Sequence, residues 1–156
     1  MARIILTGVD DSKTALRAAE KAASIAISFG AELHVLSAFT VKTNETVQVL
    51  HSKDEQAVRT HAYNTLVARY ANDAEHTAST VAAGLRTDFP GLTVISKSIE
   101  GAPGAALISE AGRLGAEVIV VGNRRVQGPA RVLGSIARTV ASEANCDLYV
   151  VHTHQR

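Results

Sequence analysis

The sequence contains one cysteine, one methionine and no tryptophan, and only 4% of its 156 residues are aromatic. The single cysteine, Cys146, excludes an internal disulfide and a zinc site built from several cysteines. So few aromatic side chains offer little surface for the base stacking by which proteins hold single-stranded nucleic acid. No apolar run approaches the roughly 20 residues of a membrane-spanning helix, and the run at residues 4–6 is too short for a signal peptide. We therefore expect a cytoplasmic protein that binds neither nucleic acid nor a membrane.

Length and charge narrow the class further. A chain of 156 residues suits one domain, residues 1–156, and its 46% of apolar residues suffice for a substantial core. The formal net charge is only +1, so any basic surface must be local.

Residues with catalytic or metal-binding chemistry do not form a recognisable set. Histidines 152 and 154 could face the same side of a strand, but two imidazoles are at most half of a zinc site. No Ser-His-Asp order and no carboxylate pair stands out. Cys146 precedes an apolar run, so we interpret it as a buried small hydrophobe. We expect no catalytic residues and no metal site.

Apolar runs typical of strands alternate with segments of helical periodicity. We expect strands at residues 3–9, 32–38, 92–96, 118–121 and 148–152, and helices at 15–29, 53–87, 103–114 and 135–144. Gly30 and Gly115 follow two of these helices, as is common at helix C-termini. This alternation predicts an α/β fold, with a parallel sheet covered by helices on both faces.

A basic loop follows the fourth expected strand. Between Glu117 and Glu143 the chain has four arginines and no acid, and a glycine–serine step at 134–135 precedes the last helix. Glycines let backbone N–H groups approach a ligand, and a helix N-terminus favours an anion. The alternative is an ordinary turn with a solvated basic face. Because ligands bind at the carboxyl ends of strands in open parallel sheets, we favour a phosphate site.

The loop after the first strand carries acids rather than a phosphate-binding motif. A Walker A loop needs a glycine directly before its lysine, but Ser12 precedes Lys13 here. A carboxylate at this position suits ribose hydroxyls or the adenine amino group. Asp10 could instead cap the following helix, although both roles are compatible if Asp11 or Ser12 is the cap. No G-x-G-x-x-G is present, so a nicotinamide or flavin site has no support.

The motifs at residues 9–12 and 122–135 resemble those of the universal stress protein family, over almost the whole chain. Residues 9–12, Val-Asp-Asp-Ser, are similar to the V-D-G-S of the family's first strand. Gly122, Gly134 and Ser135 match the first and last positions of its motif G-x2-G-x9-G-[ST]. The second glycine is replaced by Arg125, and eight residues rather than nine separate it from Gly134, while Gly128 lies where many members also have glycine. The loop is therefore altered relative to the family.

The resemblance implies a Rossmann-like five-stranded sheet in the order 3-2-1-4-5, similar to adenine nucleotide alpha hydrolases. It also implies a non-enzymatic module that binds or senses ATP, cAMP or another adenine nucleotide, with or without magnesium. Asp10 would contact ribose or adenine, with adenine against the backbone around Val9 and Ala38. The glycines and the last helix would hold the phosphates, assisted by Arg124 or Arg125. The implied nucleotide-binding residues are Val9, Asp10, Ser12, Ala38, Gly122, Arg124, Arg125, Gly128, Gly134, Ser135 and Ile136.

Two alternatives remain open. Arg125 could block the phosphate pocket or contribute a bidentate contact, so a nucleotide-independent protein-interaction module of the same fold is the second interpretation. An enzyme of the hydrolase superfamily is the third, and it is least favoured because residues 7–12 lack the paired glycines of S-G-G-x-D-S.

The last expected strand predicts self-association. It runs from Leu148 to His152, follows the final helix and would lie at an edge of the sheet. An open apolar edge is an aggregation hazard, which two copies remove by pairing antiparallel about a two-fold axis. The family resemblance also implies a homodimer through this strand.

Overall fold

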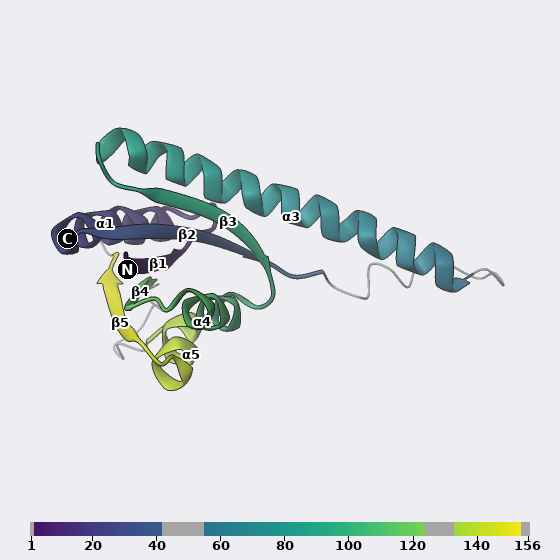
Figure 1. Cartoon of the computed structure of the whole chain (residues 1–156). Helices are drawn as coiled ribbons and strands as arrows, with labels where there is room; N and C mark the ends of the chain where they lie inside the picture. The colour runs from purple at the N-terminus through teal and green to yellow at the C-terminus, as the bar shows by residue number, and fades with distance from the viewer. Residues whose placement is uncertain (1, 42–54, 124–132, 154–156) are drawn as a thin grey trace.

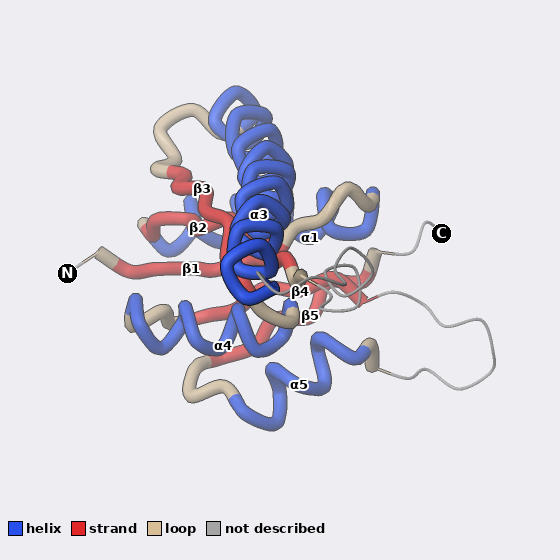
Figure 2. Tube along the Cα trace, turned by 90° about the vertical axis from the view of Figure 1, so that its right-hand side faces the viewer, coloured by secondary structure: helices blue, strands red, loops and turns tan. Residues whose placement is uncertain are grey.

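The fold was determined as a computed structural model, which describes residues 2–41, 55–123 and 133–153. The elements, in chain order, are β1 (Arg3–Gly8), α1 (Lys13–Phe29), β2 (Ala31–Phe39), α3 (Glu55–Asp88), β3 (Val94–Glu100), α4 (Pro103–Leu114), β4 (Val118–Asn123), α5 (Ser135–Glu143) and β5 (Asp147–His152). The strands form one parallel sheet in the order β3-β2-β1-β4-β5 (Figures 1 and 2). The expected α/β class and strand order are confirmed.

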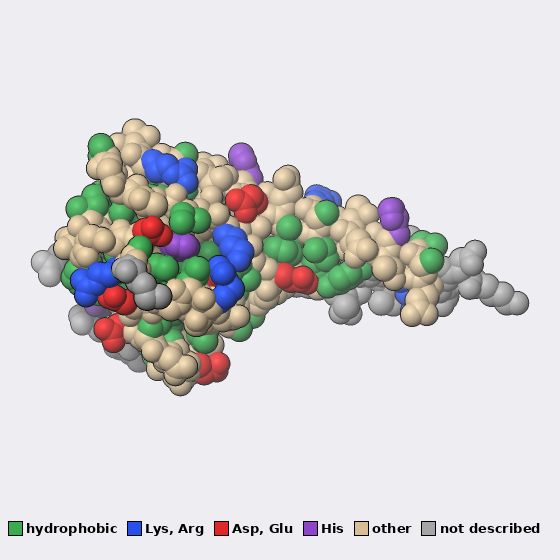
Figure 3. Space-filling view, in the orientation of Figure 1, with side chains coloured by type: hydrophobic (Ala, Val, Ile, Leu, Met, Phe, Trp, Pro, Cys, Tyr) green, Lys and Arg blue, Asp and Glu red, His purple; other side chains and the backbone are tan. Residues whose placement is uncertain are grey.

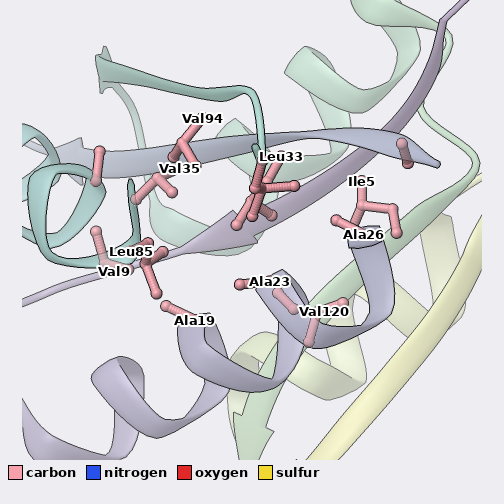
Figure 4. Packing of buried hydrophobic residues seen from close by; sticks show 14 of the residues in the cluster. Ile5, Val9, Ala19, Ala23, Ala26, Leu33, Val35, Leu85, Val94 and Val120 are labelled. Carbon is pink, nitrogen blue, oxygen red and sulfur yellow. The ribbon is translucent and has the colours of Figure 1, made fainter. Parts of the chain in front are cut away.

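Helices cover both faces of the sheet. On one face, α1 and α3 pack on the inner side chains of β1 and β2, with Ile5, Leu33 and Val35 at the centre (Figure 4). On the other face, α4 and α5 pack over Leu6 and Ile119. α1 packs on the sheet through alanines, namely Ala18, Ala19, Ala22, Ala23 and Ala26, which allow a close approach of helix to strand.

The bounds of β3 and β4 differ from the sequence expectation in ways that have a physical reason. β3 occupies Val94–Glu100 rather than 92–96, because Leu92 is buried in a turn closed by its N–H donating to Phe89 O at 3.1 Å. The second half of β3 is mostly polar and its positions are exposed or half-buried, since an edge strand is covered less completely than a central one. β4 continues to Asn123, so Gly122 belongs to the strand and not to the loop where we expected it.

The two edges of the sheet are protected differently. α3 lies along β3 (Figure 1), where Glu75 Oε2 accepts from Ser98 N at 2.8 Å and Arg86 Nη2 donates to Val94 O at 2.6 Å. β5 pairs with β4 on one side and has no other strand partner among the described residues. α3 also extends beyond the rounded body of the molecule, whose visible face mixes charges of both signs with hydrophobic side chains (Figure 3).

Candidate functional site

The chain leaves β1 and β4 toward opposite faces of the sheet, and this divergence opens a crevice at their carboxyl ends. α1 follows β1 on one face and α5 follows the neighbouring β4 on the other (Figure 2). A pocket of about 260 Å³ occupies this place, as expected of an open parallel sheet. Its lining residues come from the strand ends, the first loop and the starts of three helices: Gly8, Val9, Asp10, Ser12, Thr14, Ala15, Leu36, Ala38, Ile99, Pro103, Ala106, Leu107, Val121, Gly122, Gly134, Ser135, Ile136 and Ala137.

The structure brings the sequence-predicted residues together wherever it describes them. Those that line the pocket are Val9, Asp10, Ser12, Ala38, Gly122, Gly134, Ser135 and Ile136. The loop residues Arg124, Arg125 and Gly128 lie outside the described part of the chain. The first loop and the glycine–serine step thus meet in space at one pocket.

Ala38 presents an open backbone edge to the pocket. The N–H of Val9 donates to Leu36 O at 2.7 Å, so this N–H belongs to the sheet. Successive residues of a strand direct their backbone N–H and C=O groups to opposite neighbouring strands. The backbone groups of Ala38 therefore point to the same side as those of Leu36, toward β1. Consistent with this, the backbone C=O of Phe39 points to the opposite side, toward the end of β3, where it accepts from Gly101 N at 2.8 Å. Because β1 ends at Gly8, one donor and one acceptor of Ala38 face the pocket.

The floor of the pocket is apolar and was not predicted from the sequence. Leu36 and Leu107, which are both buried, line the pocket together with Ile99 and Pro103. A Cβ on Gly8 would lie 3.1 Å from Leu107 Cδ1, so the glycine leaves room for this leucine. The sequence nearby has the pattern Gly-Ala-Pro-Gly at 101–104, which is typical of any tight turn before a helix and does not indicate a pocket.

Asp10 and Ser12 divide two tasks at the start of α1. Ser12 caps the helix, since its Oγ accepts from Ala15 N at 3.1 Å. Asp10 Oδ1 accepts from Ser12 N at 2.8 Å, which fixes the carboxylate at the mouth of the pocket. Helix capping therefore does not depend on the Asp10 side chain.

α5, by contrast, receives no side-chain cap from any residue that the structure describes. Its N-cap is Gly134, with φ −59° and ψ 159°, a conformation open to any residue. A Cβ there would meet no described atom closer than Asn123 Oδ1 at 3.7 Å, an ordinary contact, so crowding by described residues does not require glycine. A serine or aspartate would place an oxygen on the N–H of Ile136 or Ala137. Glycine leaves the donors of the first turn open to the pocket.

The described lining of the pocket contains few groups with acid–base chemistry. Asp10 is the only ionisable side chain among the described residues that line the pocket, so they include no acid–base pair. Cys146 lies outside the pocket, half-buried against the core on the face of the sheet that α4 and α5 cover, and burial raises the pKa of its thiol. Within residues 2–41, 55–123 and 133–153, no three His, Cys, Asp or Glu side chains gather as metal ligands would. None of the described helices is both long and apolar enough to span a membrane.

Comparisons with known proteins agree with the fold and the motifs. The model of the universal stress protein family matches residues 1–152. Universal stress protein Rv1636 of Mycobacterium tuberculosis is 30% identical over 152 residues, 97% of each chain. A crystal structure of a universal stress protein in complex with cAMP superposes with a TM-score of 0.65 at 26% identity, covering 97% of this chain and 98% of the other. The Archaeoglobus fulgidus protein in complex with dAMP gives a TM-score of 0.64 at 18% identity, covering 96% and 97%.

Proposed function

This chain belongs to the universal stress protein family, and we propose that it is a non-enzymatic cytoplasmic module that binds and senses an adenine nucleotide. One observation carries the proposal: open backbone groups of Ala38 and the uncapped first turn of α5 line the same pocket. The backbone groups of Ala38 suit a nucleotide base, and the first turn of α5 suits an anion. The cAMP and dAMP complexes of structural relatives support the same ligand class.

The Ala38 edge is complementary to adenine. The adenine N6 amino group donates and its N1 accepts, which matches a backbone C=O and N–H on one residue. Guanine presents an O6 acceptor and an N1–H donor at the corresponding positions, so it would leave both pairs mismatched. The apolar floor at Leu36 and Leu107 would contact the face of the ring. We therefore propose selectivity for adenine over guanine.

The remaining groups suit ribose and phosphate. Asp10 has a carboxylate oxygen that can accept from a ribose hydroxyl while Oδ1 stays bonded to Ser12 N. The N–H groups and dipole of the α5 N-terminus attract a phosphate, and the Ser135 hydroxyl can donate to it. Arg124, Arg125 and Gly128 remain proposed phosphate contacts on sequence grounds alone.

Titration calorimetry with ATP, ADP, AMP, cAMP and the matching guanine nucleotides, with and without magnesium, tests the function. Asp10→Ala and Ser135→Ala should each weaken binding by about 1–3 kcal/mol, the usual cost of leaving a polar partner unpaired. Asp11→Ala is the matched control, since this neighbouring exposed carboxylate is not part of the pocket lining. Equal binding of adenine and guanine would contradict the assigned base edge. Absence of binding to every nucleotide would contradict the function and favour a nucleotide-independent interaction module.

A further inference from the structure

Asn123 joins the two ends of the altered glycine loop. It is the last residue of β4, and its Oδ1 accepts a hydrogen bond from Gly134 N at 3.2 Å, across eleven positions of the chain. Gly134 is the N-cap of α5, and its own C=O accepts from Arg138 N at 2.9 Å. The side chain of a strand residue therefore fixes the N-cap residue of the helix that borders the pocket.

The hydrogen bond from Gly134 N to Asn123 replaces the one that a residue within the helix often makes to the N-cap N–H. In a capping box, a Glu or Gln at the third helical position reaches back to the N-cap N–H. That position in α5 is Ala137, which has no group for this purpose. The N–H of Gly134 is instead satisfied from the sheet, so the helix start is held in register with the end of β4.

Asn123 is itself held from the opposite side. Its C=O accepts from the hydroxyl of the buried Thr153 at 2.9 Å. The C=O of Thr153 in turn accepts from Arg17 Nη1 of α1 at 2.6 Å. These bonds tie the end of β4 to the chain after β5 and to α1. The backbone that carries the Asn123 side chain is thus held by tertiary hydrogen bonds and is not a free strand end.

We propose that Asn123 is a positioning residue, which holds the N-terminus of α5 where the phosphate of the bound nucleotide meets its open N–H groups. The inference rests on the proposed function. The hydrogen bond uses the N-cap N–H alone and leaves the donors of Ser135, Ile136 and Ala137 to the ligand. Without it, the helix start would lose its side-chain link to β4, and the donors would no longer converge on one point.

The test compares a ligand that carries a phosphate with one that does not. Adenosine and AMP are titrated into the wild type, into Asn123→Ala and into the control Asn145→Ala. Asn145 is an exposed asparagine beyond the other end of α5. In Asn123→Ala we expect AMP to bind about tenfold more weakly, because the displaced N-terminus of α5 loses about one hydrogen bond to the phosphate. Adenosine has no phosphate and should bind as in the wild type. Asn145→Ala should bind both ligands normally.

The outcomes separate this inference from the function it rests on. Equal loss of adenosine and AMP binding in Asn123→Ala, or no loss of either, would overturn the positioning role while adenine binding stands. A wild type that binds neither ligand would overturn the proposed function, and the inference with it. Should Asn123→Ala fail to fold, Thr153→Val removes only the hydroxyl behind Asn123. It should weaken AMP binding by about two- to fivefold and spare adenosine, and equal effects on both would again overturn the role.

Discussion

Gly122 of β4 lies directly against Thr14 in the first turn of α1. A Cβ on Gly122 would be 3.0 Å from Thr14 Cγ2, 3.2 Å from Thr14 O and 3.3 Å from Thr153 Cγ2. The backbone carbonyl cannot move without moving the helix. This glycine of the family motif therefore has a packing reason, while Gly134 of the same motif has none among the described residues.

Gly122→Ala should destabilise the protein by about 1–3 kcal/mol, the usual effect of overpacking a tight contact. The control is Gly84→Ala in α3, where an added Cβ would meet nothing within 4 Å. That substitution should stabilise the protein by about 0.5–1 kcal/mol, because alanine favours a helix interior. Urea unfolding measures both. An unfolding free energy of Gly122→Ala equal to that of the wild type would contradict the packing explanation.

Gly134→Asp should move stability and ligand binding in opposite directions. Its carboxylate would cap the first turn of α5 and occupy the donors that we assign to phosphate. We expect the free energy of unfolding to rise by about 0.3–1 kcal/mol through the cap and the helix dipole. Affinity for AMP should fall at least tenfold, since the carboxylate also repels phosphate.

Thermal melts with and without AMP report both effects of Gly134→Asp. The control is Gly112→Ala on the solvent side of α4, which leaves the pocket intact and should not change AMP affinity. Undiminished AMP binding by Gly134→Asp would show that the α5 N-terminus does not hold the phosphate.

The alternation of elements could be predicted because each strand and helix has a local signal. Ala19, Ala22 and Ala26 recur at helical spacing and are all buried, and Gly30 ends α1 in the left-handed conformation as expected. The polar half of β3 carries no such signal, since Lys97 belongs to a strand only because β2 provides its partner.

The site was predictable where a motif marks it and not where only tertiary contacts do. Asp10 and Ser135 belong to local patterns, and the strand order brings them to one pocket. Leu107 forms the floor because α4 crosses β1 at Gly8, a contact between distant parts of the chain. Asn123 resembles any polar residue at a strand end until the position of Gly134 is known. Hydrogen-bond partners across a loop have no fixed sequence spacing.

Glu110 of α4 predicts a pH dependence of stability. Its side chain is 6% exposed, and Arg113 Nε donates to Oε2 at 2.8 Å while Lys97 Nζ donates to Oε1 at 3.1 Å. These hydrogen bonds, that of Arg113 first, lower the pKa of Glu110 from 4.5 to about 2. Because the pKa of Glu110 is lower in the folded state than in the unfolded chain, its ionised carboxylate stabilises the fold fully above about pH 4.5. This stabilisation is lost as the pH falls toward 2.

Glu110→Gln should therefore cost about 1–3 kcal/mol at pH 7, with the exposed halves of both cations reducing the effect. The difference in the free energy of unfolding between Glu110→Gln and the wild type should shrink as the pH falls from 4.5 to 2. Glu117→Gln is the control, because its pair with Arg3 at 3.2 Å is about half exposed and worth little. Urea unfolding at several pH values measures the series. A Glu110→Gln difference that does not change with pH would rule out the ionised carboxylate as its source.

No described residue pairs with the outer edge of β5, whereas α3 covers the opposite edge of the sheet at β3, and this difference predicts a homodimer through β5. Asp147 N donates to Glu117 O at 3.0 Å, so the N–H groups of Asp147, Tyr149 and Val151 face β4. By alternation, those of Leu148, Val150 and His152 face outward. Two copies that pair antiparallel would satisfy these groups and cover Tyr149, which is 42% exposed.

Val150→Pro removes an outward N–H without removing a bond to β4, so it should shift the protein from dimer to monomer or cause precipitation. Val150→Thr keeps both the N–H and the shape of the side chain, so it should remain dimeric and serves as the control. Light scattering at micromolar concentration measures the mass of each variant. The wild type should have twice the chain mass of 16.4 kDa. A soluble wild-type monomer, or a Val150→Pro protein that stays fully dimeric, would show that β5 is not the dimer interface.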